Sequence, residues 1–130
     1  MEIAHPSPSF TDGRGVIMDV LVKQPIEYVT IISSHKGAVR GNHYHRDTTQ
    51  WLYLLEGRLR LLSQLPGEPV HEAVLEKGDL IVNVPMESHA MIALEDARFL
   101  VFTRGPRGGE NYEDDTYRLA VPLAHPHDPR

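Results

Sequence analysis

The residues with the clearest potential for chemistry are three histidines in two separate parts of the chain. His43 and His45 lie two residues apart, and His89 lies in a later segment that begins at Gly78. Side chains two apart in an extended chain project to the same face, so the first two imidazoles would point in one direction. Neutral imidazole is the commonest metal ligand in proteins, and a side-chain oxygen can complete the set. The pattern predicts a divalent metal site of His43, His45, Gln50 and His89, with Zn, Fe, Ni or Mn as the ion.

Two other interpretations of these side chains stay open. The histidines can be ordinary polar residues that bind no metal. A neutral amide oxygen is a weaker ligand than a carboxylate, so Gln50 can instead hydrogen-bond a ligand histidine while water fills the fourth position. His43 and His45 are also candidate catalytic bases if the site holds no metal.

The composition of the chain is that of an ordinary globular domain. We expect one domain over residues 1–130, with a core at about residues 12–104 and a loop-rich tail over residues 105–130. There is no cysteine, which excludes disulfides and thiolate catalysis. The net charge is −5 and the Lys and Arg residues are scattered, so we expect no nucleic-acid partner. No apolar run approaches membrane-spanning length and no basic-then-apolar leader opens the chain, so we expect a cytoplasmic protein without a membrane partner.

Short apolar segments recur about every 8 to 12 residues, with Gly, Pro or Asp between them, which is typical of a β-sandwich or barrel. Asp12–Gly15 is a turn signal, and Glu56–Gly57 predicts a hairpin between its two flanking strands. No segment before residue 105 has a helical period. We therefore expect an all-β fold, a double-sheet jelly roll. Its expected strands cover residues 16–22, 28–33, 50–55, 58–65, 70–75, 80–84, 89–94 and 98–103.

Alternation along residues 50–55 predicts which side chains face the interior. Gln50, Leu52 and Leu54 share one face, which we expect to point inward, and the other face carries an apolar stripe of Trp51, Tyr53 and Leu55. An exposed apolar stripe is a liability unless another surface covers it. We therefore predict a homodimer, with the alternative that the ends of the chain cover the stripe.

Arginine and tyrosine side chains are the candidate substrate-binding residues. Arg40, Arg60 and Tyr112 are our choices, because an inward Arg60 would bind a carboxylate or phosphate with two parallel hydrogen bonds. Residues 104–118 are rich in glycine and charge, so they form either a solvated connection or a lid that places Arg104, Arg107 or Tyr112 over the barrel mouth. His125 and His127, near the end of the chain, are expected to bind metal only adventitiously.

The spacing of residues 37–57 resembles the first sequence signature of the cupin superfamily. That signature has a glycine, two histidines, a carboxylate and a second glycine, which here are Gly37, His43, His45, Gln50 and Gly57, with Gln50 in place of glutamate. The second signature keeps its glycine and histidine, Gly78 and His89, whereas its proline is shifted by one position to Pro85. The resemblance covers about residues 12–104, and it implies a double-stranded β-helix, the cupin barrel.

Within the cupins, the chain resembles small enzymes that modify nucleotide sugars. Arg40-Gly-Asn-His-Tyr-His45-Arg46 followed by Gln50 is similar to a stretch in sugar 3,4-ketoisomerases and in the cupin domain of capsular-polysaccharide reductases. The resemblance implies an isomerase or epimerase that transfers a proton next to a carbonyl of a nucleotide-sugar or other carbohydrate-derived, anionic keto substrate. His43 or His45 would act as the base, or a metal would polarise the carbonyl. An iron-dependent dioxygenase and a non-catalytic small-molecule-binding cupin are the alternatives.

Overall fold

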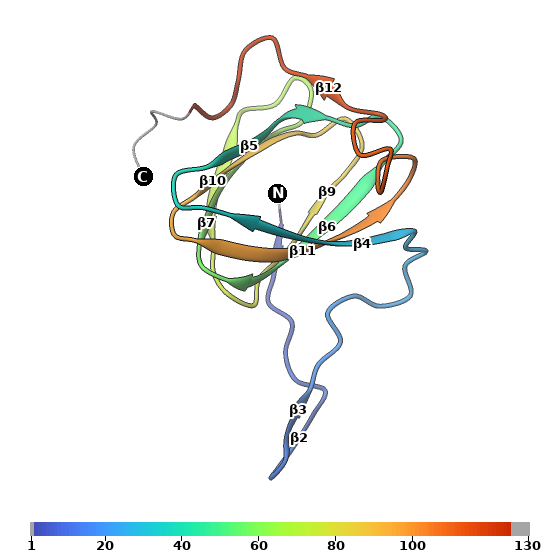
Figure 1. Cartoon of the computed structure of the whole chain (residues 1–130), viewed down its shortest axis with the longest axis vertical. Helices are drawn as coiled ribbons and strands as arrows, with labels where there is room; N and C mark the ends of the chain where they lie inside the picture. Colours follow the sequence, from blue (N-terminus) through green and yellow to red (C-terminus); the bar gives the residue numbers. More distant parts are fainter. Residues whose placement is uncertain (1, 126–130) are drawn as a thin grey trace.

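The computed structural model describes residues 2–125, which fold into two five-stranded antiparallel sheets around one apolar core (Figure 1). This is the all-β jelly roll that the strand signals predict. The first sheet has the order β1-β9-β6-β11-β4, and the second sheet has the order β12-β5-β10-β7-β8. The strands of the first sheet are β1 (Ile3–Ala4), β4 (Tyr28–Ser34), β6 (Thr49–Glu56), β9 (Leu80–Asn83) and β11 (Ala97–Arg104). Those of the second sheet are β5 (Val39–Tyr44), β7 (Leu59–Gln64), β8 (His71–Leu75), β10 (Ser88–Ala93) and β12 (Tyr117–Arg118).

The core forms where the inward faces of the two sheets meet. Leu52 and Leu54 of β6 point inward together with Gln50, as the alternation predicts, and each is at most 8% exposed. Fully burying one such leucine contributes about 1.5–3 kcal/mol relative to leaving it in water. The buried core cluster draws on both sheets and comprises Leu52, Leu54, Leu59, Leu61, Leu75, Ile81, Ala93, Ala97, Phe99 and Val101.

The turn at Gly57 carries the chain from one sheet to the other. β6 pairs with β9 and β11, whereas β7 pairs with β10 and β8. Gly57 has a φ of +86°, and a Cβ there would overlap the carbonyl oxygen of Asp96. The predicted hairpin between residues 50–55 and 58–65 is therefore wrong. A turn signal marks where the chain reverses, but it does not say which sheet the next strand joins.

A two-stranded ribbon projects from the body of the domain (Figure 1). It consists of β2 (Phe10–Asp12) and β3 (Gly15–Ile17), which are joined by the predicted turn at residues 12–15. The strand expected over residues 16–22 ends at Ile17, because β3 pairs only with the short β2. The ribbon leaves apolar side chains in solvent, since Phe10, Val16 and Ile17 are each more than half exposed.

The two ends of the described chain cover parts of the outer sheet faces. Residues 2–4 lie beside Trp51, which is only 9% exposed, so the chain itself covers this member of the apolar stripe. At the other end, Leu123 and Ala124 pack on the outer face of the second sheet against Leu62 and Ile92. Residues 2–125 contain no helix, and so none that could span a membrane.

Candidate functional site

The site begins with the pairing of β5 and β10, which places His43 directly opposite His89. The two strands approach closely at Gly41, where φ is +90° and a Cβ would lie 2.8 Å from the carbonyl oxygen of His89. The register of the pair shifts between His89 and Ala90. A glycine at position 41 therefore allows the contact that brings two histidines from distant segments together.

His45 follows immediately after β5 and completes a cluster of three rings. The ring centroids of His43 and His89 are 4.7 Å apart, and His45 lies 4.9 Å from His43 and 5.2 Å from His89. Each ring offers one nitrogen, and these three atoms lie within 4.8 Å of one another. All three side chains are buried, with residue exposures of 1–7%. At these separations the three nitrogens could hold one metal ion.

Backbone carbonyls fix the protonation of two of the rings. Nδ1 of His45 donates a hydrogen bond to the carbonyl oxygen of Asp115 at 2.9 Å, and Nδ1 of His89 donates to that of Glu87 at 3.1 Å. In the neutral ring the proton is then on Nδ1 and the lone pair on Nε2, which is the arrangement usual for metal-ligating histidines. Nε2 of His45 and Nδ1 of His43 are buried without a hydrogen-bond partner among the described residues. Unpaired buried nitrogens of this kind fit a bound metal ion.

The environment keeps the three imidazoles neutral. Burial lowers the pKa of His43 to about 2, with further lowering from the neighbouring histidines and from Arg107. Burial likewise lowers the pKa of His89 to about 4. The pKa of His45 is also lowered by burial, but the Asp115 carbonyl and the Gln50 side chain act in the opposite direction. Neutral imidazole is the form that binds metals, so the electrostatics suit the same function as the geometry.

Gln50 lies on β6, opposite Asn83 of β9 and Thr103 of β11 in the sheet register. It is 8% exposed, and its amide nitrogen donates to Thr103 Oγ1 at 3.3 Å. Since the nitrogen has this partner, the amide oxygen is the atom left to serve a ligand. The side chain is close enough to His45 to influence its pKa, so Gln50 borders the histidine cluster. Because Nδ1–H of His45 is donated to the Asp115 carbonyl, the neutral ring has no N–H left for this oxygen to accept.

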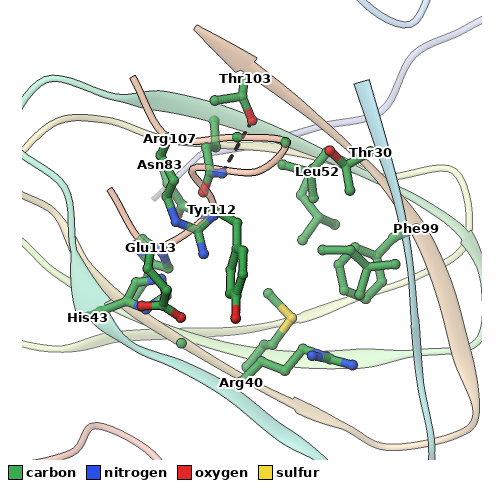
Figure 2. A pocket seen from close by; sticks show the side chains of 18 of the residues that line it. Thr30, Arg40, His43, Leu52, Asn83, Phe99, Thr103, Arg107, Tyr112 and Glu113 are labelled. Atoms are coloured by element: carbon green, nitrogen blue, oxygen red, sulfur yellow. Dashed lines mark hydrogen bonds between the residues drawn. The ribbon is translucent and has the colours of Figure 1, made fainter. Parts of the chain in front are cut away.

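A cavity of about 570 Å³ opens beside the histidines, between the inner faces of the two sheets. Its floor is apolar, and its polar wall includes His43, His89, Gln50 and Asn83. The loop after β11 covers part of it, and Figure 2 shows Arg107, Tyr112 and Glu113 of this loop above the cavity. The lid interpretation of residues 104–118 therefore agrees with the structure better than a merely solvated connection does.

Two of the three substrate-binding candidates line the cavity, and the third lies outside it. Arg40 and Tyr112 both line the cavity, and Figure 2 shows Tyr112 crossing its middle. Arg60 does not line it, because its side chain lies on the face of β7 opposite the core residues Leu59 and Leu61 and pairs with Glu72 of β8. The expectation that Arg60 points into the barrel is corrected accordingly. The alternation with these two leucines was visible in the sequence, but not which face was inward.

The loop holds residues that sequence reasoning missed. Asp115 accepts hydrogen bonds through its carboxylate from the backbone N–H groups of Arg46 and Asp47, at 3.0 and 2.8 Å, and from Thr48 Oγ1 at 2.8 Å. These contacts hold the lid against the turn that follows His45. They join segments almost 70 residues apart, and no local periodicity signals such contacts. Arg118 and Glu113, which form an ion pair at 3.0 Å on the cavity wall, were also missed.

Of the two histidines near the end of the chain, the structure describes only His125, which is not part of this cluster. His125 is exposed, and His127 lies outside the described residues. Among residues 2–125, the buried group of His43, His45 and His89 is the one set of side chains placed to hold a metal ion.

Comparison with known proteins identifies the family. A model of the cupin family matches residues 6–112, so the chain belongs to the cupins. A search of curated proteins found no match. The family resemblance of the two histidine-containing signatures is thereby confirmed for most of the chain.

Several solved structures share the fold at low sequence identity. The sugar 3,4-ketoisomerase QdtA from Thermoanaerobacterium thermosaccharolyticum, in complex with TDP, has a TM-score of 0.71 and 19% identity, covering 92% of this chain and 88% of its own. A dTDP-4-dehydrorhamnose 3,5-epimerase from Sulfolobus tokodaii gives 0.64 and 22%, covering 78% of this chain and 68% of its own. The capsular polysaccharide assembling protein CapF from Staphylococcus aureus gives 0.65 and 17%, covering 89% and 33%. Another QdtA structure contains TDP-4-keto-6-deoxyglucose.

Proposed function

We propose that the protein is an isomerase or epimerase that moves a proton next to the carbonyl group of a nucleotide-sugar or other carbohydrate-derived keto substrate. The observation that carries the proposal is the convergence of three buried, neutral imidazoles beside a cavity, with His43 and His89 on its wall. Similar folds in a 3,4-ketoisomerase and a 3,5-epimerase of nucleotide sugars support this reaction class.

We further propose that His43, His45 and His89 hold a divalent metal, with Gln50 as the fourth ligand. When bound, the ion would polarise the substrate carbonyl and so acidify the neighbouring C–H. The low pKa of His43 favours this ligand function over that of a base, since a base works best with a pKa near the operating pH. In a metal-free reaction His45 would be the second candidate base, and its contacts with Asp115 and Gln50 oppose the lowering of its pKa by burial.

The test is solvent-deuterium exchange with TDP-4-keto-6-deoxyglucose as substrate. We expect deuterium to enter at the carbon next to the keto group, and we expect His43→Asn and His45→Asn to abolish the exchange. His71→Asn is the matched control, because His71 is exposed on β8 and lies outside the cavity wall. Absence of exchange with this and other keto sugar nucleotides would overturn the proposal.

Elemental analysis of freshly purified protein separates this function from an iron-dependent dioxygenase. Three neutral histidines with an open coordination position suit Fe(II) as well as Zn or Ni. Stoichiometric iron, together with O₂ consumption and no deuterium exchange, would favour the dioxygenase. Exchange that persists after chelation would assign the base function to the histidines themselves.

We also propose that the protein is a homodimer in which a second copy covers the outer face of β4. β4 is an edge strand, and its outward residues Val29 and Ile31 are 62% and 55% exposed. The projecting β2–β3 ribbon adds Phe10, Val16 and Ile17 to the exposed apolar surface. Light scattering should give the mass of a dimer, and Ile31→Lys should shift it toward monomer. A monomeric wild-type protein at micromolar concentration would contradict this part of the proposal.

A further inference from the structure

Arg107 is the side chain whose position calls for a ligand. It lies in the lid and lines the cavity together with His43 and His89. Its charge is close enough to contribute to the pKa lowering of His43, His45 and His89 alike. The guanidinium is therefore directed at the same space as the histidines, and Figure 2 shows it extending from the loop into that space.

The guanidinium of Arg107 has a hydroxyl partner but no paired carboxylate among the described residues. Nε of Arg107 donates to Thr116 Oγ1 at 3.1 Å, and within residues 2–125 no carboxylate forms an ion pair with it. Burial lowers the pKa of Arg107, and the nearby Glu113 carboxylate, which is paired with Arg118, opposes this lowering only in part. A partly buried arginine without a carboxylate paired to it is costly, and the cost is recovered when an anion binds.

The rest of the cavity wall is also short of negative charge. Three arginines line it, at positions 40, 107 and 118, against a single carboxylate, that of Glu113. Glu113 is already paired with Arg118. Arg40 is exposed at the rim and donates to the Ser34 hydroxyl and to the backbone. Position 50 is the neutral glutamine, so no ligand carboxylate offsets the field, and a bound divalent cation would make the cavity still more positive.

Close packing holds the loop that carries Arg107 in place. Gly108 is pressed on the ring of Tyr28, where any Cβ would overlap the ring, and Gly105 packs on the backbone of Asp47 and Thr48. Asp115 fixes the far end of the loop through its three hydrogen bonds to residues 46–48. Arg107 is thus presented by a fitted segment rather than by a free coil, as a binding residue must be.

We propose that Arg107 forms an oxyanion-binding subsite beside the three histidines, which takes a carboxylate or phosphate oxygen pair of the ligand. This inference rests on the proposed function only for the choice of a sugar-nucleotide probe. The subsite adds a specificity determinant to the pocket, because a neutral sugar leaves the guanidinium desolvated and unpaired.

The test is calorimetric binding to the purified protein with two pairs of probes. TDP against thymidine tests a phosphate source, and glucuronate against methyl glucoside tests a carboxylate source. Charge-assisted hydrogen bonds of this kind correspond to an affinity loss of roughly 10- to 100-fold when the donor is removed. We expect Arg107→Gln to weaken one or both anionic probes by this factor and to leave the neutral probes unchanged. Arg107→Lys should retain part of the affinity.

Arg98→Gln is the matched control, because Arg98 is exposed on β11 and does not line the cavity. It should bind all four probes as the wild type does, and thermal unfolding should show that each variant is folded. Equal losses for charged and neutral probes, unchanged affinity in Arg107→Gln, or failure of the wild type to bind either anion would overturn the subsite. Anion binding that depends on Arg107, without deuterium exchange, would refute the proposed reaction and leave the subsite standing.

Discussion

The substitution Gly41→Ala tests whether the close approach of β5 and β10 builds the histidine cluster. A Cβ at this position would lie 2.8 Å from the His89 carbonyl oxygen and 3.1 Å from the Ala90 Cα. Both neighbours are backbone atoms, so neither can rotate away. The strands must separate by several tenths of an ångström, which moves His43 relative to His89.

The expected loss of stability in Gly41→Ala has two parts, one conformational and one steric. The φ of +90° costs an alanine about 1–2 kcal/mol wherever it occurs, partly offset by the lower entropy of the unfolded chain. The steric overlap adds about 1–3 kcal/mol, as overpacking does in other well-packed interiors. We therefore expect Gly41→Ala to lower the free energy of unfolding by about 2–4 kcal/mol in total.

The substitution Gly78→Ala separates the conformational cost of the positive φ from the steric cost of the added Cβ. Gly78 also has a φ of +90°, but a Cβ there would meet nothing within 4 Å. The control should therefore show the conformational cost alone. Urea unfolding of both variants gives the free energies, and chelator competition gives their metal affinities. Equal destabilisation of the two variants, with equal metal affinity, would refute the idea that contact at Gly41 sets the cluster.

Other predictions concern the site itself. His45→Ala should abolish stoichiometric metal binding, measured by elemental analysis, and unchanged metal content would remove His45 from the site. Gln50→Glu should tighten divalent-metal binding by adding charge, about tenfold by chelator competition, whereas unchanged affinity would mean that position 50 is not a ligand. Asp115→Ala should lower the free energy of unfolding by about 1–3 kcal/mol and weaken metal binding, while Asp115→Asn recovers part of both; equal effects would contradict the hydrogen-bonding explanation. In metal-free protein the unfolded state binds more protons than the native state between pH 6.5 and about 4, because the pKa of His89 is lowered, so stability should fall as the pH falls through this window. Urea unfolding at several pH values should show a shallower fall for His89→Gln, and an unchanged pH dependence would contradict the burial of a neutral His89.

The sequence predicts the strands and histidines of the site better than the loop residues that complete it. Strand alternation identifies the inward face of β6. The histidine spacing predicts a cluster, and the structure forms it because β5 and β10 are neighbours in the second sheet. Pairing between distant strands is not visible locally, so the turn at Gly57 does not reveal that β6 and β7 lie in different sheets. The inward face of β7 is equally hidden, so the sequence does not place Arg60 outside the barrel. Arg107 and Asp115 lie in an irregular segment whose shape depends on contacts with residues 28 and 46–48. Composition alone cannot reveal such contacts.

The lid is an irregular segment packed on the barrel, while the histidines belong to the barrel strands and the turn that follows β5. Reactive groups and recognition groups are thus encoded in different stretches of the chain. Changes over residues 105–116 can alter which molecule is accepted without disturbing the strand pairing that sets His43 against His89. Under the proposed function, grafting this loop between related domains should change ligand preference and keep the reaction type. Such a graft must retain the hydrogen bond from His45 Nδ1 to the Asp115 carbonyl, because that contact fixes the tautomer of the ring.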